Sequence, residues 1–190
     1  MTRFPTGFAL LASVSLAALL AVGPAHARSP RALAPETPGL SASHEEVARL
    51  LRADQPAEAL RSAEDLLATR PNDAQLRFLK GVAQSQNGQP DAASETFGAL
   101  TQDYPELPEP YNNLAVLHAA AGRLEQARVA LETALRLSPG YATAHQNLGD
   151  VYARLAAQAW QRALELEPAN STLRPRLQIL QQLPGEAAAR

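Results

Sequence analysis

The stretch YNNLAVLHAAAGRLEQARVALETALRLSP, residues 111–139, contains a pattern of small and apolar residues that recurs on both sides of it. Steps of 34 residues in either direction from Ala115 lead each time to a small or modest side chain, and three further columns follow the same period. The four columns are Val47, Gly81, Ala115 and Gly149; Ala59, Ala93 and Ala127; Ala63, Phe97 and Leu131; and Pro71, Pro105 and Pro139. A fixed period of this length indicates a repeat architecture.

Small residues at two points of each repeat indicate a pair of antiparallel helices in close contact. Two helices approach closely only where their contact points carry Gly or Ala, and larger residues fill the spaces between successive pairs. Gly88 and Gly122 are placed to form the turn inside a pair, and the proline at the end of each repeat stops its second helix. The sequence therefore predicts an all-α array of helical hairpins.

This pattern resembles the tetratricopeptide repeat (TPR), a helix–turn–helix unit of the same period. The resemblance covers residues 40–168, about 3.5 to 4 repeats, and is strongest in the third copy, where Ala115 takes position 8. It implies a TPR solenoid whose first helices line a concave groove. The chain as a whole is similar to small exported bacterial TPR proteins.

The fourth repeat departs from the pattern because its second set of landmarks arrives five residues early. Ala156, Trp160 and Pro168 stand where residues 161, 165 and 173 would continue the period. The missing residues are those of the turn, and one stripe of apolar residues runs through at helical spacing. We therefore expect one fused helix over residues 142–167. A C-terminal capping helix, within residues 169–184, is expected to cover it with Leu173, Leu177, Leu180 and Leu183.

The N-terminus has the pattern of an export signal. Arg3 is its one charged residue, residues 8–22 are apolar, and Ala25-His26-Ala27 offers small residues for cleavage. We expect a signal peptide over residues 1–27, cleaved after Ala27, and no stable membrane insertion after cleavage. An uncleaved anchor is the alternative, but the apolar run is shorter than the roughly 20 residues that a spanning helix needs.

Residues 28–43 are rich in proline and poor in apolar side chains, which predicts a disordered linker. The TPR array is expected over residues 44–168, and residues 185–190 are expected to form a frayed tail. The mature protein is therefore predicted to be periplasmic or secreted.

The composition argues against several classes of function. The chain has no cysteine, which excludes disulfides, catalytic thiols and thiolate metal sites. Its formal net charge is -2, and Lys80 is its one lysine, so a basic surface for nucleic acid is not expected.

Candidate catalytic residues are few, and no cofactor or metal is expected. No HExxH, GxSxG or P-loop spacing occurs. His118 and His145 stand at positions 11 and 4 of their repeats, where aromatic residues usually pack between helices, so a packing role is favoured. The acidic residues fall on outer helical faces. We therefore expect no enzymatic activity.

The resemblance implies a peptide-binding groove formed by positions 2, 5, 6, 9, 12 and 13 of the first helices. Asn113 and Asn147 both stand at position 6, where an amide can donate to and accept from an extended peptide backbone, although Asn is also a common residue of the repeat. The candidate groove residues are Phe78, Val82, Ser85, Gln86, Glu109, Asn112, Asn113, Val116, Thr143, Gln146, Asn147, Asp150 and Arg154.

The sequence thus favours a non-enzymatic periplasmic adaptor that binds a peptide segment or a helix of another cell-envelope protein. One alternative is a self-assembling protein, such as a homodimer, whose long fourth-repeat helix pairs between chains. Another is an accessory to cell-wall enzymes that contacts glycan through Trp160 and a few tyrosines.

Overall fold

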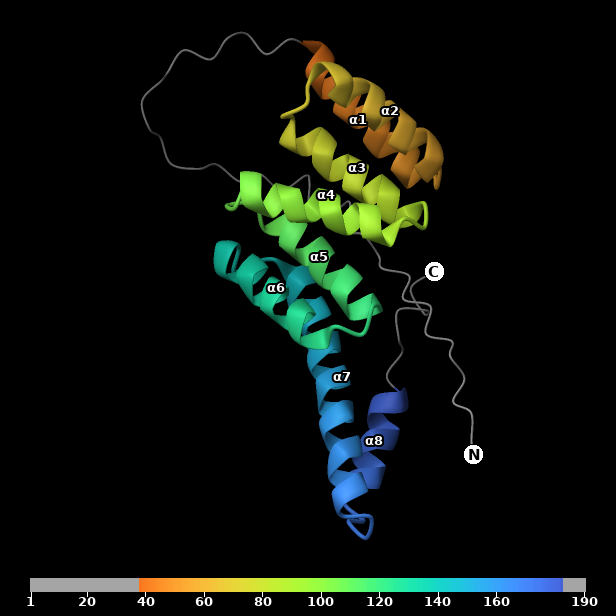
Figure 1. Ribbon diagram of the computed structural model, residues 1–190, viewed down its shortest axis with the longest axis vertical. Coiled ribbons are helices and arrows are strands. Elements are labelled where there is room, and N and C mark those ends of the chain that lie inside the picture. The colour runs from red at the N-terminus through yellow and green to blue at the C-terminus, as the bar shows by residue number, and fades with distance from the viewer. Residues whose placement is uncertain (1–37, 183–190) are drawn as a thin grey trace. The chain divides into compact units, whose positions relative to one another are not determined.

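The computed structural model describes residues 38–182, and the helices named below lie within that range (Figure 1). The predicted signal peptide (1–27), the predicted linker up to residue 37 and the predicted tail (185–190) lie outside the described residues.

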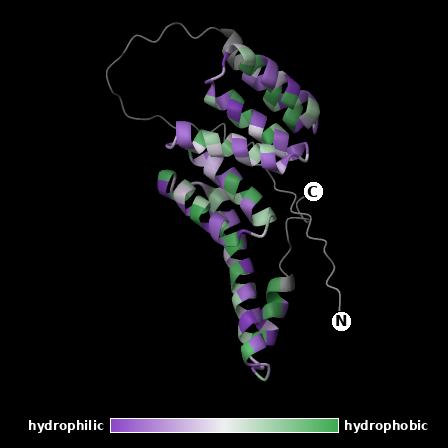
Figure 2. Cartoon of the chain, viewed as in Figure 1, coloured by the Kyte–Doolittle hydropathy of each residue, from purple (hydrophilic) through white to green (hydrophobic). Residues whose placement is uncertain are grey.

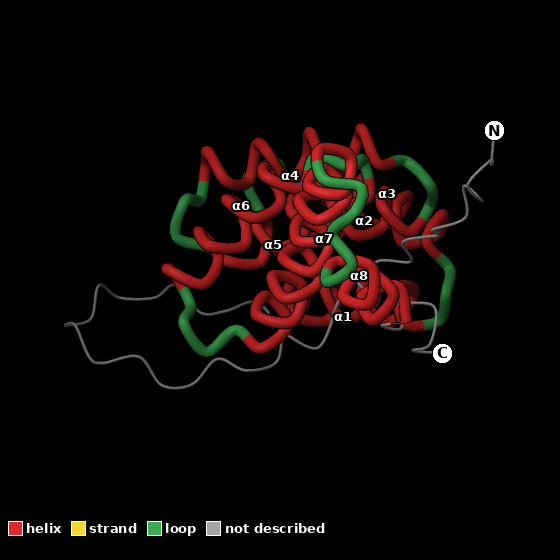
Figure 3. The backbone as a smooth tube through the Cα atoms, turned by 90° about the horizontal axis from the view of Figure 1, so that it is seen from below, coloured by secondary structure: helices red, strands yellow, loops and turns green. Residues whose placement is uncertain are grey.

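Every regular element between residues 38 and 182 is a helix (Figure 3). The helices are α1 (Pro38–Arg52), α2 (Pro56–Thr69), α3 (Ala74–Gln86), α4 (Pro90–Asp103), α5 (Pro108–Ala120), α6 (Leu124–Leu137), α7 (Ala142–Leu166) and α8 (Leu173–Gln182). The predicted all-α class is confirmed. Helix α1 begins at Pro38, so it includes the last residues of the segment predicted to be a linker. Among the described helices, none is long and apolar enough to cross a membrane.

The chain forms two compact units, which divide within α5 between Leu114 and Ala115. In the first unit, α1 packs on α2, α2 on α3, and α3 on α4 (Figure 1). Most of its core comes from the columns that define the period: Val47, Ala59, Ala63, Ala93 and Phe97 are fully buried, and so is Val82, next to Gly81.

A close helix–helix approach occurs at Gly81, in the middle of α3. A Cβ atom built on Gly81 would lie 2.7 Å from the ring of Phe97 on α4. Real Cβ atoms do not approach other atoms that closely, so the helices pack at this distance only because position 8 lacks a side chain. Gly81 and Phe97 therefore form a single contact between α3 and α4.

Each complete hairpin turns at one residue in the left-handed backbone region. Gly88 and Gly122 have φ angles of 73° and 75°. Asp54, at the equivalent place in the first repeat, has a φ of 55°, a conformation that Asp tolerates better than most residues. The turns at Gly88 and Gly122 were predicted from the sequence, and the turn at Asp54 was not. Pro56 and Pro90 then begin the second helices, where their missing N–H groups cost no hydrogen bond.

A side-chain cap starts the second repeat. The Asp73 carboxylate accepts a hydrogen bond from the Leu76 N–H at 3.0 Å and contacts His44 Nε2 at 2.9 Å. Burial alone would raise the pKa of Asp73, but these bonds and the charges of His44 and Arg70 outweigh it and lower the pKa. The ionised form that caps α3 is therefore the favoured one.

In the second unit, α7 is one helix of 25 residues that contains both halves of the fourth repeat. The predicted fusion of the two helices is confirmed, and Figure 2 shows hydrophilic residues interspersed with hydrophobic ones along α7. Helix α8 folds back along the C-terminal half of α7: Leu173 is buried, and the Arg176 guanidinium lies 5.9 Å from the centre of the Trp160 ring. It begins at Leu173, within the predicted range, after Asn170 holds Thr172 in a turn through its side-chain oxygen.

The close approach at Gly81 makes a testable prediction. Gly81→Ala should lower the free energy of unfolding by about 1–3 kcal/mol, because the added methyl group overpacks the Phe97 ring. Gly98→Ala is the control: nothing lies within 4 Å of a Cβ there, so it should be stabilising by about 0.5–1 kcal/mol. Urea melts measure both. In a double-mutant cycle with Phe97→Leu, the two costs should be less than additive; strict additivity would contradict the contact.

Candidate peptide-binding surface

The groove residues predicted on α3 divide into buried and accessible ones. Phe78 and Val82 are buried, and the Phe78 ring packs against Phe97 with centroids 5.7 Å apart. Ser85 is half-buried and Gln86 is exposed. Phe78 and Val82 therefore belong to the core of their hairpin, and the polar pair at the end of α3 is what a ligand could reach.

On α5, the two asparagines are not accessible. Asn112 is 3% exposed and Asn113 is 6% exposed. The Asn113 amide nitrogen donates to the Glu109 carbonyl at 2.9 Å, one turn earlier in the same helix. Glu109 and Val116 are half-buried. The Asn113 amide, which was predicted to meet a peptide backbone, is instead buried and bonds within its own helix.

On α7, the predicted residues remain accessible. Gln146 and Asp150 are exposed, and Thr143 and Asn147 are half-buried. They stand three and four residues apart and so share one side of the helix. Although Asp150 is exposed, nearby protein atoms partly desolvate its carboxyl and raise its pKa.

Arg154 has a structural partner in its own unit. Its Nη1 donates to the Ala119 carbonyl at 2.8 Å, among the last residues of α5, where carbonyls lack partners within the helix. Burial lowers the pKa of this guanidinium. Arg154 therefore ties α7 to the end of α5.

The thirteen predicted residues fall on both sides of the division within α5. Phe78 to Asn113 belong to the first unit, and Val116 to Arg154 belong to the second. The structure brings Thr143, Gln146, Asn147 and Asp150 together on one helix in the second unit, and it buries four of the residues in the first.

The described histidines make contacts that hold the fold. The Arg123 Nε–H donates to His118 Nδ1 at 3.2 Å, and burial, together with the charge of Arg123, lowers the pKa of His118. His145 Nε2 lies 2.9 Å from the Pro139 carbonyl. Within residues 38–182, no three His, Asp or Glu side chains are grouped as metal ligands.

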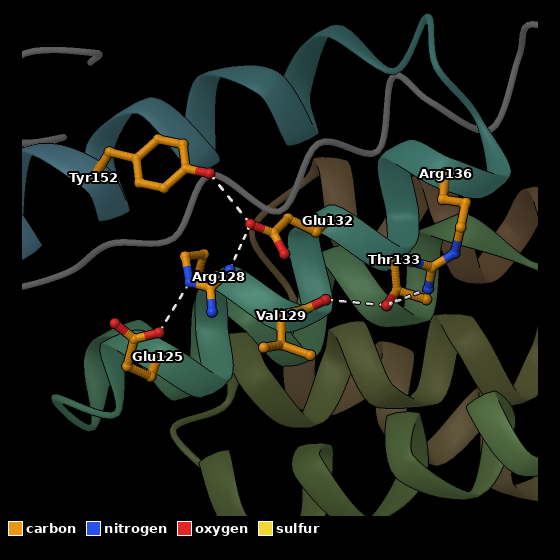
Figure 4. Close-up of polar contacts among 7 residues, drawn as sticks. All are labelled: Glu125, Arg128, Val129, Glu132, Thr133, Arg136 and Tyr152. Carbon is orange, nitrogen blue, oxygen red and sulfur yellow. Dashed lines mark hydrogen bonds and ion pairs between the residues drawn. The ribbon is translucent and has the colours of Figure 1, made fainter.

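A polar network between α6 and α7 was not predicted from the sequence (Figure 4). Arg128 bonds to Glu125 at 2.9 Å and to Glu132 at 2.6 Å, and Glu132 accepts a hydrogen bond from the Tyr152 hydroxyl at 3.2 Å. Local desolvation by neighbouring atoms and the hydrogen bond to Glu132 raise the pKa of Tyr152, so its hydroxyl stays protonated and donates. The network fixes the first half of α7 on α6. The spacing of Glu125, Arg128 and Glu132 on one helix face was the signal available in the sequence.

Family models match most of the array. A model described as "Tetratricopeptide repeat" matches residues 50–117, and one described as "TPR repeat" matches residues 117–156. A curated relative, the chloroplastic tetratricopeptide repeat domain-containing protein PYG7 of Arabidopsis thaliana, is 36% identical over 83 residues. That match covers 41% of this chain and 28% of PYG7, so the chain spans less than a third of that protein's length.

Solved structures of the same fold include a bacterial and a human protein. The TPR protein TTC0263 of Thermus thermophilus has a TM-score of 0.58 at 26% identity, covering 74% of this chain and 80% of TTC0263. The second TPR domain of human RPAP3, solved in complex with the HSP70 peptide SGPTIEEVD, has a TM-score of 0.54 at 16% identity. That comparison covers 61% of this chain and 98% of the RPAP3 domain, and it concerns the fold alone.

Proposed function

This chain belongs to the tetratricopeptide repeat family, and on that premise we propose that it is a non-enzymatic adaptor that binds a peptide segment or a helix of another protein. We further propose that it acts in the periplasm and that its partner is a protein of the cell envelope. The fold itself does not specify a partner, so the kind of partner has to be inferred from the accessible residues.

The observation that carries this proposal is the polar face of α7. Thr143, Gln146, Asn147 and Asp150 stand at groove positions of the repeat and retain accessible surface in the unit that holds α7. Amide and hydroxyl groups can both donate to and accept from a peptide backbone. A regular helix presents them at fixed spacing, which reduces the entropy lost when a peptide binds.

The charge on this face favours a neutral or basic segment. Asp150 is an acceptor when ionised, and binding a cationic or N–H-rich segment would compensate for its partial desolvation. Positions 5, 6 and 9 of repeats two to four hold no Lys or Arg: they are Phe78, Leu79, Val82, Asn112, Asn113, Val116, Gln146, Asn147 and Asp150. An acidic C-terminal peptide like the one in the RPAP3 complex is therefore not the proposed ligand.

A displayed library of random linear peptides tests the binding face. We expect the protein to enrich peptides without a terminal acidic cluster. Gln146→Ala with Asp150→Ala should weaken their binding by about tenfold, since each lost hydrogen bond is worth about 0.5–1.5 kcal/mol. Fluorescence anisotropy of a labelled selected peptide measures the affinity.

The matched control changes two exposed residues further along the same helix, Gln158→Ala with Gln161→Ala. This variant should bind within about twofold of the wild type, because surface changes away from a contact cost little. Equal loss in the two variants, or no enrichment at all, would count against the α7 face as the binding site.

Export is tested by expressing the whole chain in a Gram-negative bacterium. The tripartite pattern of residues 1–27 predicts that the protein is recovered from the periplasmic fraction with Arg28 as its first residue. Intact-mass spectrometry of that fraction gives the start site. Recovery of the uncleaved chain in the membrane fraction would instead support the anchor alternative.

A further inference from the structure

In the second repeat, the second helix covers a defined part of the first. Phe97, at position 24, packs on Gly81, at position 8, and Thr96 donates a hydrogen bond of 2.7 Å to Gln84, at position 11. Gln84 is 7% exposed as a result. The second helix therefore packs on positions 8 and 11 of the first helix, and this packing surface is called the seat below.

The same seat is uncovered in the fourth repeat. Gly149 and Tyr152 occupy positions 8 and 11 of α7. A Cβ atom on Gly149 would meet no atom within 4 Å, and Tyr152 is 47% exposed, with its hydroxyl bonded back to Glu132 of α6 (Figure 4). Among residues 115–182, nothing takes the place that Phe97 and Thr96 take in the second repeat.

The residues of α7 that correspond to Ala93 and Phe97, and so would pack on such a seat, are themselves partly exposed. Ala156 and Trp160 stand at positions 20 and 24, and the residues at those positions in the three complete repeats are fully buried. Ala156 and Trp160 are only half-buried, although α8 packs beside them. Among residues 42–180, the exposed large apolar side chains all lie in this second unit: Val129, Leu137, Tyr152, Leu166 and Ile179.

A straight helix cannot bring these two surfaces together. Gly149 and Trp160 are eleven residues apart, which places them about 16 Å apart along the α7 axis at about 1.5 Å per residue. Gly149, Tyr152, Ala156, Trp160 and Ala163 recur at spacings of three and four residues, so the seat and the segment that fits it lie on one side of the helix.

We propose that a second copy of this chain covers the seat, with the two α7 helices antiparallel. Trp160 of each copy then packs on Gly149 of the other, about a twofold axis between residues 154 and 155, at the centre of α7. The contact is isologous, as in most homodimers. Each copy supplies the second helix that the other lacks, which is helix exchange caused by the loss of a turn.

A second copy is the occupant because its residues 156–167 carry the small and large side chains of the repeat's second helix at the required spacing. The antiparallel pairing also repeats the packing of α1 on α2 and of α3 on α4. The proposal does not depend on peptide binding, since the seat and the proposed peptide-binding residues are different side chains of α7.

The mass in solution gives the first test, with the protein recovered after expression of the whole chain. Light scattering should give the mass of a dimer, and dilution should red-shift the emission of Trp160, the chain's one tryptophan. A monomer at every concentration up to several hundred micromolar would overturn the proposal.

Gly149→Leu separates the dimer from the fold. The monomer has open space at this site, and leucine is a better helix former than glycine, so the melting temperature should not fall when it is measured at a dilution where the wild type is also monomeric. The dimer should be lost, because the new side chain fills the place of Trp160 from the second copy. Gly98→Leu, at another helical glycine with open space, should remain a dimer. A Gly149→Leu variant that is still dimeric would refute the pairing.

A cysteine pair tests the register without relying on a disruptive change. His145→Cys and Ala163→Cys in one chain lie 18 residues apart, about 27 Å along a straight helix, too far for a disulfide within one copy. In the antiparallel pair each cysteine meets the other in the second copy. Mild oxidation should yield covalent dimers from the double variant and none from either single variant. A dimer that cross-links in the single variants, or not in the double variant, would contradict this register.

Discussion

The contact between the two helices of a repeat is the constraint on which the structure depends. At Gly81 the helices approach until a single methyl group would overlap the Phe97 ring. In the first repeat, positions 20 and 24 are alanines, and Ala59 and Ala63 are fully buried where α2 packs on α1. This contact requires the chain to reverse within a few residues, and the reversal requires a residue that adopts a left-handed conformation cheaply.

The fourth repeat shows what happens when that residue is absent. Asp54, Gly88 and Gly122 have positive φ at one place in the three complete repeats, and continuing the count from Gly149 puts Ala156 there. Alanine is the best helix former and has no ready access to the left-handed region. The helix therefore continues to Leu166, α8 covers one side of its second half, and the seat at Gly149 and Tyr152 stays open. One local backbone property thus determines both the length of α7 and the surface it exposes.

Much of this fold could be predicted from the sequence because it depends on periodicity and on turn residues. The repeat columns identified the core, and the early arrival of Trp160 and Pro168 identified the fused helix. The turn at Asp54 was missed because aspartate adopts the left-handed region less often than glycine. The start of α1 at Pro38 was missed because a proline-rich segment suggests a linker, although proline is well suited to the first turn of a helix.

The candidate site was harder to predict, because position in a repeat does not determine exposure. Asn113 and Asn147 share position 6, yet Asn113 is buried and bonds within its own helix, whereas Asn147 keeps accessible surface. Likewise, Arg154 stands at a groove position but holds the end of α5. Those outcomes depend on neighbouring helices that a single repeat's sequence does not reveal. The accessible polar residues of α7 are the part of the predicted groove on which the proposed function rests.

The continuity of α7 is the central claim, and a distance between two spin labels tests it most directly. The chain has no cysteine, so His145→Cys with Glu165→Cys gives two specific labelling sites on exposed positions. Labelled protein diluted with an excess of unlabelled protein reports the distance within one copy. A continuous helix predicts about 30 Å for 20 residues. A distance near 10 Å, the usual separation of packed helix axes, would show that the chain reverses and that the fourth repeat is an ordinary hairpin.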